Sequence, residues 1–265
     1  MRKIFLYIVS LFIIPFSVNA QELEAGIVVG GANYFGDLAP RPVLGETNLA
    51  YGVFGRLNFS SSFAFTATIM QATVSGNDKN FAFNNDRNLN FHTDILEYAA
   101  LVEFNFFKYG MRPVDKKFSP FVFLGISIFE YNPQTSYLGN TIDLRNIQTE
   151  DVSYGTISYG IPFGMGIKYQ FKHNYALEAT FGLRKTFTDY LDDVSSVYPD
   201  LDKELLNKGV LAAQLSDRSQ ELHDGVFQNK LGYRRGNSDF NDWYMFFTLT
   251  VAYRFNKVTR CGRFL

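Results

Sequence analysis

The chain has 265 residues, of which 46% are hydrophobic and 17% aromatic, and its formal net charge at pH 7 is −1. A charge so close to zero provides no basic face, so we expect no nucleic-acid partner. The single cysteine excludes an intramolecular disulfide framework.

The first twenty residues have the pattern of a secretory signal peptide. Arg2 and Lys3 are followed by the apolar run Ile4–Phe16 and then by the small-residue segment Val18–Ala20. The apolar run is shorter than the roughly 20 residues that a membrane-spanning helix needs. The sequence therefore predicts a signal peptide over 1–20 that is cleaved after Ala20, and an exported protein.

The remaining chain contains eight candidate β-strands between Glu22 and Phe255. Side chains that alternate between apolar and polar are typical of strands with one lipid-facing and one lumen-facing side. In chain order the candidates are centred on Ala25–Tyr34, Leu49–Phe59, Ser62–Thr73, Leu96–Phe106, Phe121–Tyr131, Ile161–Phe171, Tyr175–Arg184 and Trp243–Phe255. The fifth is apolar on both faces, which suggests a strand buried on both sides.

The links between these strands alternate between short and long. The short links are Ser60–Ser62, Lys108–Lys117 and Lys172–Asn174, and the long links are Asp37–Thr47, Ser75–Asp94, Asn132–Val152 and Thr188–Asp242. This predicts an all-β fold over 21–255, an eight-stranded antiparallel up-and-down transmembrane β-barrel in outer-membrane lipid. The long loops are expected to be extracellular, with a short helix in Pro199–Asp217, and both termini periplasmic.

Charged side chains fall on the inward-facing positions of several predicted strands. The interior of an eight-stranded barrel is just wide enough to be filled by side chains, and an unpaired buried charge is costly. We therefore predict a structural ion-pair network in the lumen rather than an ion pathway. Its members are Arg56, Glu97, Glu103, Lys168, Glu178, Arg184 and Arg254.

Motifs for catalysis, metal binding or cofactor binding are missing from the sequence. The acidic group Asp189, Asp192, Asp193, Asp200 and Asp202 lacks the order of a calcium loop, so we interpret it as loop solvation. A rim enzyme that uses His92 and His223 is the remaining catalytic alternative. We expect no enzymatic activity, no metal and no cofactor.

Several blocks spread over the chain resemble one protein family. They are Glu24–Leu38, Thr188–Ser195, Ala212–Ser219, Arg235–Asn237 and Asp242–Tyr244. In this order they are similar to the PorG-like outer-membrane proteins of the Bacteroidota type IX secretion system, a family also described as a domain of unknown function. The resemblance implies an accessory barrel that anchors secretion machinery, and in gliding species the motility machinery. It also implies partners similar to the periplasmic ring proteins PorK and PorN.

Basic residues on the periplasmic side are the expected partner contacts. They are Arg112, Lys116 and Lys117 in one short turn, and Lys257, Arg260 and Arg263 in a basic tail over 256–265. The alternative is a surface-facing barrel that acts as an adhesin or ligand-binding protein through Phe81–Phe91 and Thr188–Asp242. A small channel is a further alternative.

Overall fold

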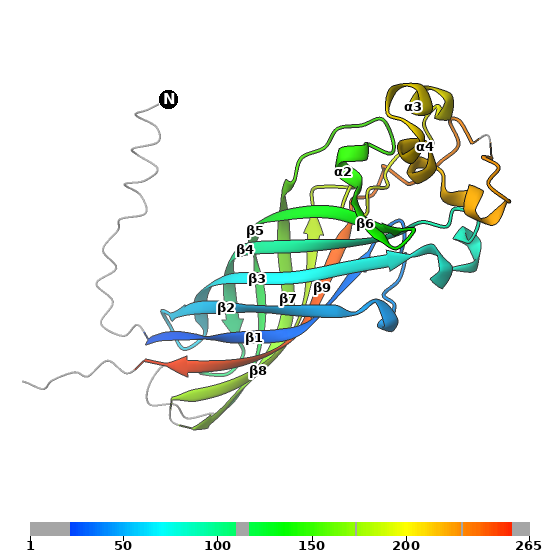
Figure 1. Cartoon of the computed structure of the whole chain (residues 1–265). Helices are drawn as coiled ribbons and strands as arrows, with labels where there is room; N and C mark the ends of the chain where they lie inside the picture. Colours follow the sequence, from blue (N-terminus) through cyan, green and yellow to red (C-terminus); the bar gives the residue numbers. More distant parts are fainter. Residues whose placement is uncertain (1–21, 110–116, 173, 229, 256–265) are drawn as a thin grey trace, which may run out of the picture.

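The computed structural model describes residues 22–109, 117–172, 174–228 and 230–255, and these form a closed antiparallel β-barrel. The sheet order is β4-β3-β2-β1-β9-β8-β7-β5-β6, and β4 also pairs with β5, which closes the cylinder. Figure 1 shows the strands wrapped around one axis. The strands are β1 (Glu22–Phe35), β2 (Asn48–Asn58), β3 (Phe63–Asn77), β4 (Asn90–Asn105), β5 (Phe118–Tyr137), β6 (Asn140–Asp143), β7 (Ile157–Lys172), β8 (Tyr175–Thr186) and β9 (Trp243–Arg254).

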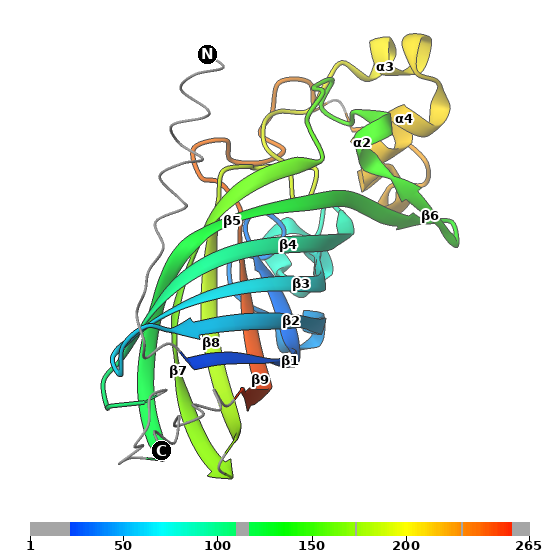
Figure 2. The same ribbon diagram turned by 90° about the vertical axis from the view of Figure 1, so that its left-hand side faces the viewer.

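The helices all lie in the long links at one end of the barrel, which we call the capped end (Figure 2). We call the other end the turn end. The α-helices are α2 (Leu144–Ile147), α3 (Leu201–Asn207) and α4 (Val210–Ser216), and the 3-10 helices are η1 (Leu44–Glu46), η2 (Asp78–Asn80), η3 (Ala82–Asn84) and η4 (Arg218–Leu222). The eight-stranded barrel predicted from the sequence is confirmed, with β6 as an additional strand outside the barrel wall. The helix expected in Pro199–Asp217 is interrupted at Gly209, whose φ is +88°.

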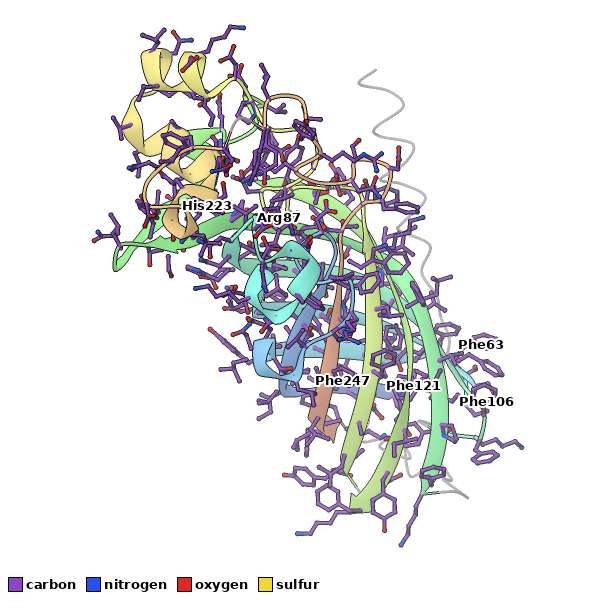
Figure 3. The ribbon with its side chains drawn as sticks, turned by 90° about the vertical axis from the view of Figure 1, so that its right-hand side faces the viewer. Phe63, Arg87, Phe106, Phe121, His223 and Phe247 are labelled. Carbon is purple, nitrogen blue, oxygen red and sulfur yellow. The ribbon has the colours of Figure 1, made fainter. Side chains whose placement is uncertain are left out.

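The outer face of the barrel is apolar and the inner face is mixed. In β5, Val122, Leu124 and Ile126 are exposed, whereas Phe121 and Phe123 point inward and are buried. The expectation that this strand is covered on both sides is therefore wrong, because its apolar outer face has no protein over it. Such an outer band is what a bilayer requires of a barrel. Figure 3 places the aromatic side chains of Phe63 and Phe106 near the turn end.

Three strands continue past the apolar band at the capped end, and here the sequence-based boundaries are wrong. The long links predicted over Ser75–Asp94 and Asn132–Val152 are shorter, because β3 runs to Asn77, β4 begins at Asn90 and β5 reaches Tyr137. The outer faces of these strands become polar at one level, so the apolar–polar alternation ends there and the sequence predicts loops. The strands persist because their inner faces remain buried; Phe91, Thr93, Thr135 and Tyr137 are buried there.

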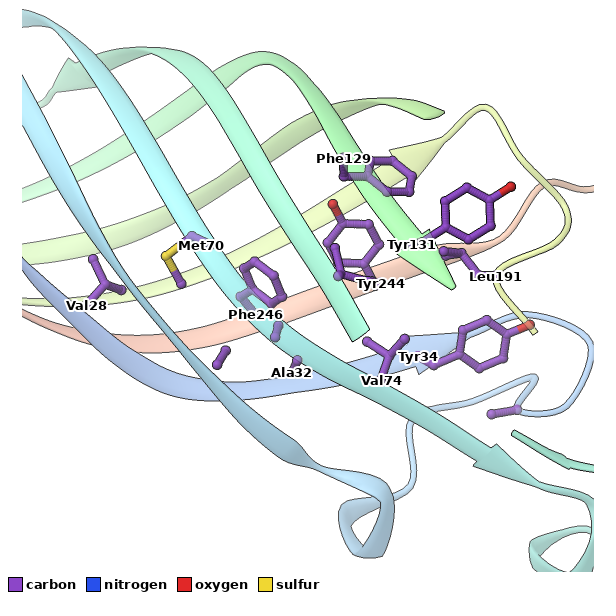
Figure 4. Close-up of a cluster of buried hydrophobic side chains, with 14 of the residues drawn as sticks. Val28, Ala32, Tyr34, Met70, Val74, Phe129, Tyr131, Leu191, Tyr244 and Phe246 are labelled. Carbon is purple, nitrogen blue, oxygen red and sulfur yellow. The ribbon is translucent and has the colours of Figure 1, made fainter. Parts of the chain in front are cut away.

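The hydrophobic core fills the barrel from its middle to the capped end. Figure 4 shows Val28, Met70 and Phe246 deeper in the barrel, and Tyr34, Tyr131 and Leu191 closer to the mouth. The inward-facing Gly164 leaves space for Phe123, because a Cβ at this glycine would lie 2.7 Å from the phenylalanine ring. The lumen is thus packed with side chains, as the narrow interior of eight strands requires.

Among the described residues, no helix is both long enough and apolar enough to span a membrane.

Candidate functional site: a plugged lumen and its cap

An ion-pair layer closes the lumen near the turn end. The guanidinium of Arg56 contacts Glu24 at 2.9 Å, Glu103 at 3.1 Å and Glu178 at 2.5 Å. All four side chains are buried. Because one cation holds three carboxylates from three other strands, this contact ties the barrel wall together across its interior.

Two further cations complete this layer. Lys168 pairs with Glu103 at 2.5 Å and lies over the Phe121 ring at 4.2 Å, and Arg254 pairs with Glu24 at 2.7 Å. The bases Arg56, Lys168 and Arg254 therefore match the buried acids Glu24, Glu103 and Glu178 in number, and the partly exposed Glu22 also lies 3.3 Å from Arg254. Matched and hydrogen-bonded charges are the arrangement in which buried ions are tolerated.

A second, smaller layer lies closer to the capped end. Arg184 contacts Glu97 at 3.3 Å, and the hydroxyl of Tyr244 donates a hydrogen bond to Glu97 at 2.6 Å. A cavity of about 70 Å³, lined by Arg56, Glu103 and Arg184 among others, separates the two layers. Such a polar cavity has room for water.

All seven residues expected in the lumen lie inside the barrel, but in two layers rather than in one network. Glu24, which pairs with two of the three cations of the first layer, is not among the residues predicted from the sequence. Every second residue of β1 points inward, so Val28, Gly26 and Glu24 are successive inward positions. Continuing this alternation from Val28 past Gly26 would have placed Glu24 in the lumen. Glu24 is instead the first residue of the first block that resembles the secretion family.

The candidate partner contacts are mostly outside the described residues. Arg112, Lys116, Lys257, Arg260 and Arg263 fall there, as does the predicted signal peptide over 1–20. Lys117 is described: its side chain is exposed, and its carbonyl accepts a hydrogen bond from the Gln170 amide at 2.7 Å. Of the six basic residues predicted to contact a periplasmic partner, the structure therefore describes Lys117, which is exposed at the turn end.

A folded cap covers the opposite mouth of the barrel. The loop between β8 and β9 sends Leu191 and Val194 into the hydrophobic core, where both are buried. The Thr93 hydroxyl donates a hydrogen bond to the Leu191 carbonyl at 2.6 Å, which fixes the loop to β4. The hydrophobic core of the barrel therefore extends into the cap, and this part of the loop is packed against the barrel.

The blocks that resemble the secretion family meet in this cap. Asp37 accepts a hydrogen bond from the Asn237 amide at 3.0 Å, and Arg235 donates to the Asp193 carbonyl at 2.6 Å. Glu150 accepts bonds from the Ser195 amide at 3.0 Å and from Arg235 at 2.9 Å. Sequence segments up to 200 positions apart thus form one polar cluster, which is buried at Glu150 and Arg235 and partly buried at Asp37.

Tyr34 joins both ends of the capping loop to β1. Its hydroxyl lies 2.6 Å from Oδ2 of Asp192 and 2.6 Å from Oδ1 of Asp242. All three residues are buried. Gly36 is required beside them, because a Cβ at this position would lie 2.0 Å from the Tyr34 hydroxyl oxygen and 2.1 Å from Asp242 Oδ1.

The interpretation of the aspartates as loop solvation is wrong for three of the five. Asp189, Asp192 and Asp193 are buried, whereas Asp202 is exposed and Asp200 caps α3. Burial raises the pKa of Asp189 to about 7, and burial also raises the pKa of Asp193 to about 6 although Arg235 opposes the shift. A tertiary fold over a loop cannot be read from local spacing, so the sequence offered no signal for this burial.

Within the described ranges, no group of three or more His, Cys, Asp or Glu side chains is placed to hold a metal ion. His92 Nε2 lies 3.1 Å from Gln134 Oε1, and His223 is exposed near the capped end (Figure 3).

A closed antiparallel barrel with an apolar outer band, a plugged lumen and one capped mouth defines a transmembrane β-barrel of the outer-membrane type. The model of the family described as "Domain of unknown function (DUF6089)" matches residues 2–213. The chain belongs to this family. No curated protein matches the chain.

Several solved outer-membrane barrels are similar to the chain. The attachment invasion locus protein Ail of Yersinia pestis is 9% identical with a TM-score of 0.40, and the match covers 89% of this chain and 98% of Ail. Neisserial surface protein A is 8% identical with a TM-score of 0.43, over 89% and 97% of the two chains. OprG of Pseudomonas aeruginosa is 9% identical with a TM-score of 0.38, over 90% and 96%. At such low identities and TM-scores, these likenesses carry no inference about function.

Proposed function

We propose that this barrel is an accessory, anchoring component of the type IX secretion machinery in the outer membrane, without enzymatic activity. The observation that carries the proposal is the filled lumen, in which Arg56, Lys168 and Arg254 are matched by carboxylates. A lumen filled in this way has no room for protein cargo, so the barrel must act through its surfaces. The resemblance of the cap blocks to the PorG-like proteins supplies the machinery to which those surfaces would belong.

In this proposal the capped end is extracellular and the turn end faces the periplasm. The short turns then present exposed basic groups such as Lys117 to ring proteins similar to PorK and PorN. Surface charges of this kind steer and orient protein contacts. Arg112 and Lys116 in the same turn, with Lys257, Arg260 and Arg263 in the tail, are the proposed further contacts, and the organism's gliding would depend on the same association.

Charge removal at the turn end tests this proposal directly. We expect that replacing Arg112, Lys116 and Lys117 by Gln, together with deletion of 256–265, abolishes co-purification of the ring proteins from outer membranes. The matched control is Lys203→Gln, an exposed lysine at the capped end. The proposal fails if the altered barrel inserts normally and retains both the ring proteins and secretion.

A surface-binding role is the second candidate, and one observation favours it. The cap exposes large apolar side chains that a purely structural lid does not need, including Leu206 at 84% and Phe240 at 73% exposure. Exposed apolar surface of this kind often marks a protein-binding site. If Leu206→Ser and Phe240→Ser abolish attachment to a surface ligand while secretion continues, the adhesin-like role replaces the first proposal.

A further inference from the structure

Tyr34 makes two hydrogen-bond contacts with aspartate oxygens, but its hydroxyl has only one hydrogen to donate. Asp192 Oδ1 accepts from the Val194 amide at 2.9 Å, and Asp242 Oδ2 accepts from the Leu191 amide at 3.0 Å. The remaining oxygen of each carboxyl group lies 2.6 Å from the same phenol oxygen. A phenol carries a single hydrogen and can therefore donate to only one of them.

The second contact needs a proton on one of the carboxyl groups. A protonated aspartate donates its O–H to the phenol oxygen, while the phenol donates to the other aspartate, so every oxygen is then satisfied. With both carboxyl groups ionised, two buried negative charges would share one donor, and like charges this close disfavour double ionisation. Asp192, Asp242 and Tyr34 thus form a site for one proton.

Among the described residues, no cation is bonded to either carboxyl group in place of this proton. Arg87 interacts electrostatically with Asp192, but its guanidinium is bonded to Asp78 at 2.6 Å and to the carbonyls of Arg235 at 2.6 Å and Asp37 at 3.0 Å. None of the ion pairs within the described part of the chain includes Asp192 or Asp242.

The other titratable groups around the site are acids or phenols. Asp37 faces it from the loop after β1, Asp189 from the capping loop itself, and Tyr131 from β5, where its hydroxyl lies 3.0 Å from Thr188 Oγ1. Burial, reinforced by these carboxylates, raises the pKa of both Asp192 and Asp242 well above the ordinary range.

We propose that Asp192, Tyr34 and Asp242 form a latch that holds one proton, and that loss of this proton releases the capping loop from the barrel mouth. The geometry gives the latch its effect, because Asp192 lies near the start of the loop and Asp242 is its last residue before β9. The amides bonded to the two carboxyl groups belong to Leu191 and Val194, which fill the mouth. An opened latch therefore frees the hydrophobic part of the cap as well.

Hydrogen exchange of the loop tests the latch in the full-length protein in lipid vesicles. We expect amide exchange over 187–196, corrected for the intrinsic rate, to rise as the latch loses its proton at a pH above the ordinary range of an aspartate. Asp192→Asn and Asp242→Asn supply an N–H donor that does not titrate, so each should make this rise about tenfold smaller than in the wild type. Asp200→Asn, an equal charge change at the rim of the same loop, should leave the rise unchanged.

The proposal is overturned if both amide variants keep the wild-type rise within about twofold, or if Asp200→Asn reduces it equally. An infrared spectrum of the wild type keeps the test decisive if the amide variants do not fold. The spectrum should show a protonated carboxylic acid besides that of Asp189, whose pKa is about 7, and the band of this second acid should disappear as the loop begins to exchange. A spectrum with ionised carboxylates only, at a pH where the loop is protected, contradicts the latch.

Discussion

The two ends of this barrel bury charged groups in opposite ways. Near the turn end, Glu24, Glu103 and Glu178 are held by an equal number of cations. At the capped end, Asp192 and Asp242 share a phenol, and neither is part of an ion pair between described residues. The stability of the lumen layer should depend little on pH because its charges are paired. The stability of the cap should depend on pH because its carboxyl groups share a proton. The lumen is therefore the constant part of the molecule and the cap the responsive part.

The largest expected effect comes from breaking the charge balance of the lumen. Arg56→Ala leaves Glu178 without its cation and removes one of two cations from Glu103 and Glu24. Removal of one partner from a buried ion pair costs about 3–5 kcal/mol of unfolding free energy. Urea unfolding in lipid vesicles should show this loss.

The matched control for this prediction is Arg234→Ala. The ion pair of Arg234 with Asp239 spans 3.6 Å between two well-exposed side chains. Exposed pairs contribute between about 0 and 1 kcal/mol, so this substitution should leave the unfolding free energy nearly unchanged. Equal losses from both arginine substitutions would contradict the special role assigned to the lumen layer.

A smaller loss of stability is expected from breaking the ion pair between Glu150 and Arg235 in the cap, which is buried like the ion pairs of the lumen. Glu150 accepts bonds from the amides of Ser195 and Ser196 and from Arg235. Glu150→Ala leaves these buried donors without their acceptor, at a cost of about 2–3 kcal/mol in local stability. Proteolysis of the cap should accelerate while the barrel itself stays folded, and Glu150→Gln, which keeps one acceptor, should lose about half as much. Unchanged proteolysis in Glu150→Ala would show that the cap does not depend on this carboxylate.

The contrast between lumen and cap also explains which buried charged residues could be predicted from the sequence. Strand geometry sends every second side chain inward, so Arg56 and Glu103 could be placed in the lumen from alternation alone. No local rule does this for Asp192, whose burial depends on Tyr34, 158 positions earlier. The upper parts of β3, β4 and β5 were misread as loops for a related reason: their outer faces are polar, and the apolar cap over their inner faces is a tertiary feature.

When the latch is removed by substitution, the stability of the cap should still depend on pH, through the carboxyl groups of Asp189 and Asp193. Burial raises the pKa of Asp189 to about 7 and that of Asp193 to about 6, both above the ordinary value of 3.8. The folded cap then binds more protons than the unfolded loop, so stability is full below the ordinary value and falls as the pH rises through about 6–7.

Limited proteolysis of an Asp192→Asn background at about pH 5 and about pH 8 measures this part. Cleavage of the capping loop should be roughly tenfold faster at the higher pH, and Asp189→Asn should remove most of that difference. A difference that persists in the double variant would assign the remaining titration to Asp193 or to a group outside the cap.

The smallest effect is expected from a charge pair on the outside of the cap. Lys203 reaches Asp200 at 3.4 Å across the first turn of α3, with its side chain 75% exposed. Solvent screens such a pair, so Lys203→Ala should change cap stability by less than about 0.5 kcal/mol in the same proteolysis assay. This result would separate burial from charge as the cause of the larger effects, because the pair lies in the same loop as Asp192. A loss comparable to that of Glu150→Ala would mean that the cap depends on its surface charges, and the contrast between its interior and the lumen would no longer explain its behaviour.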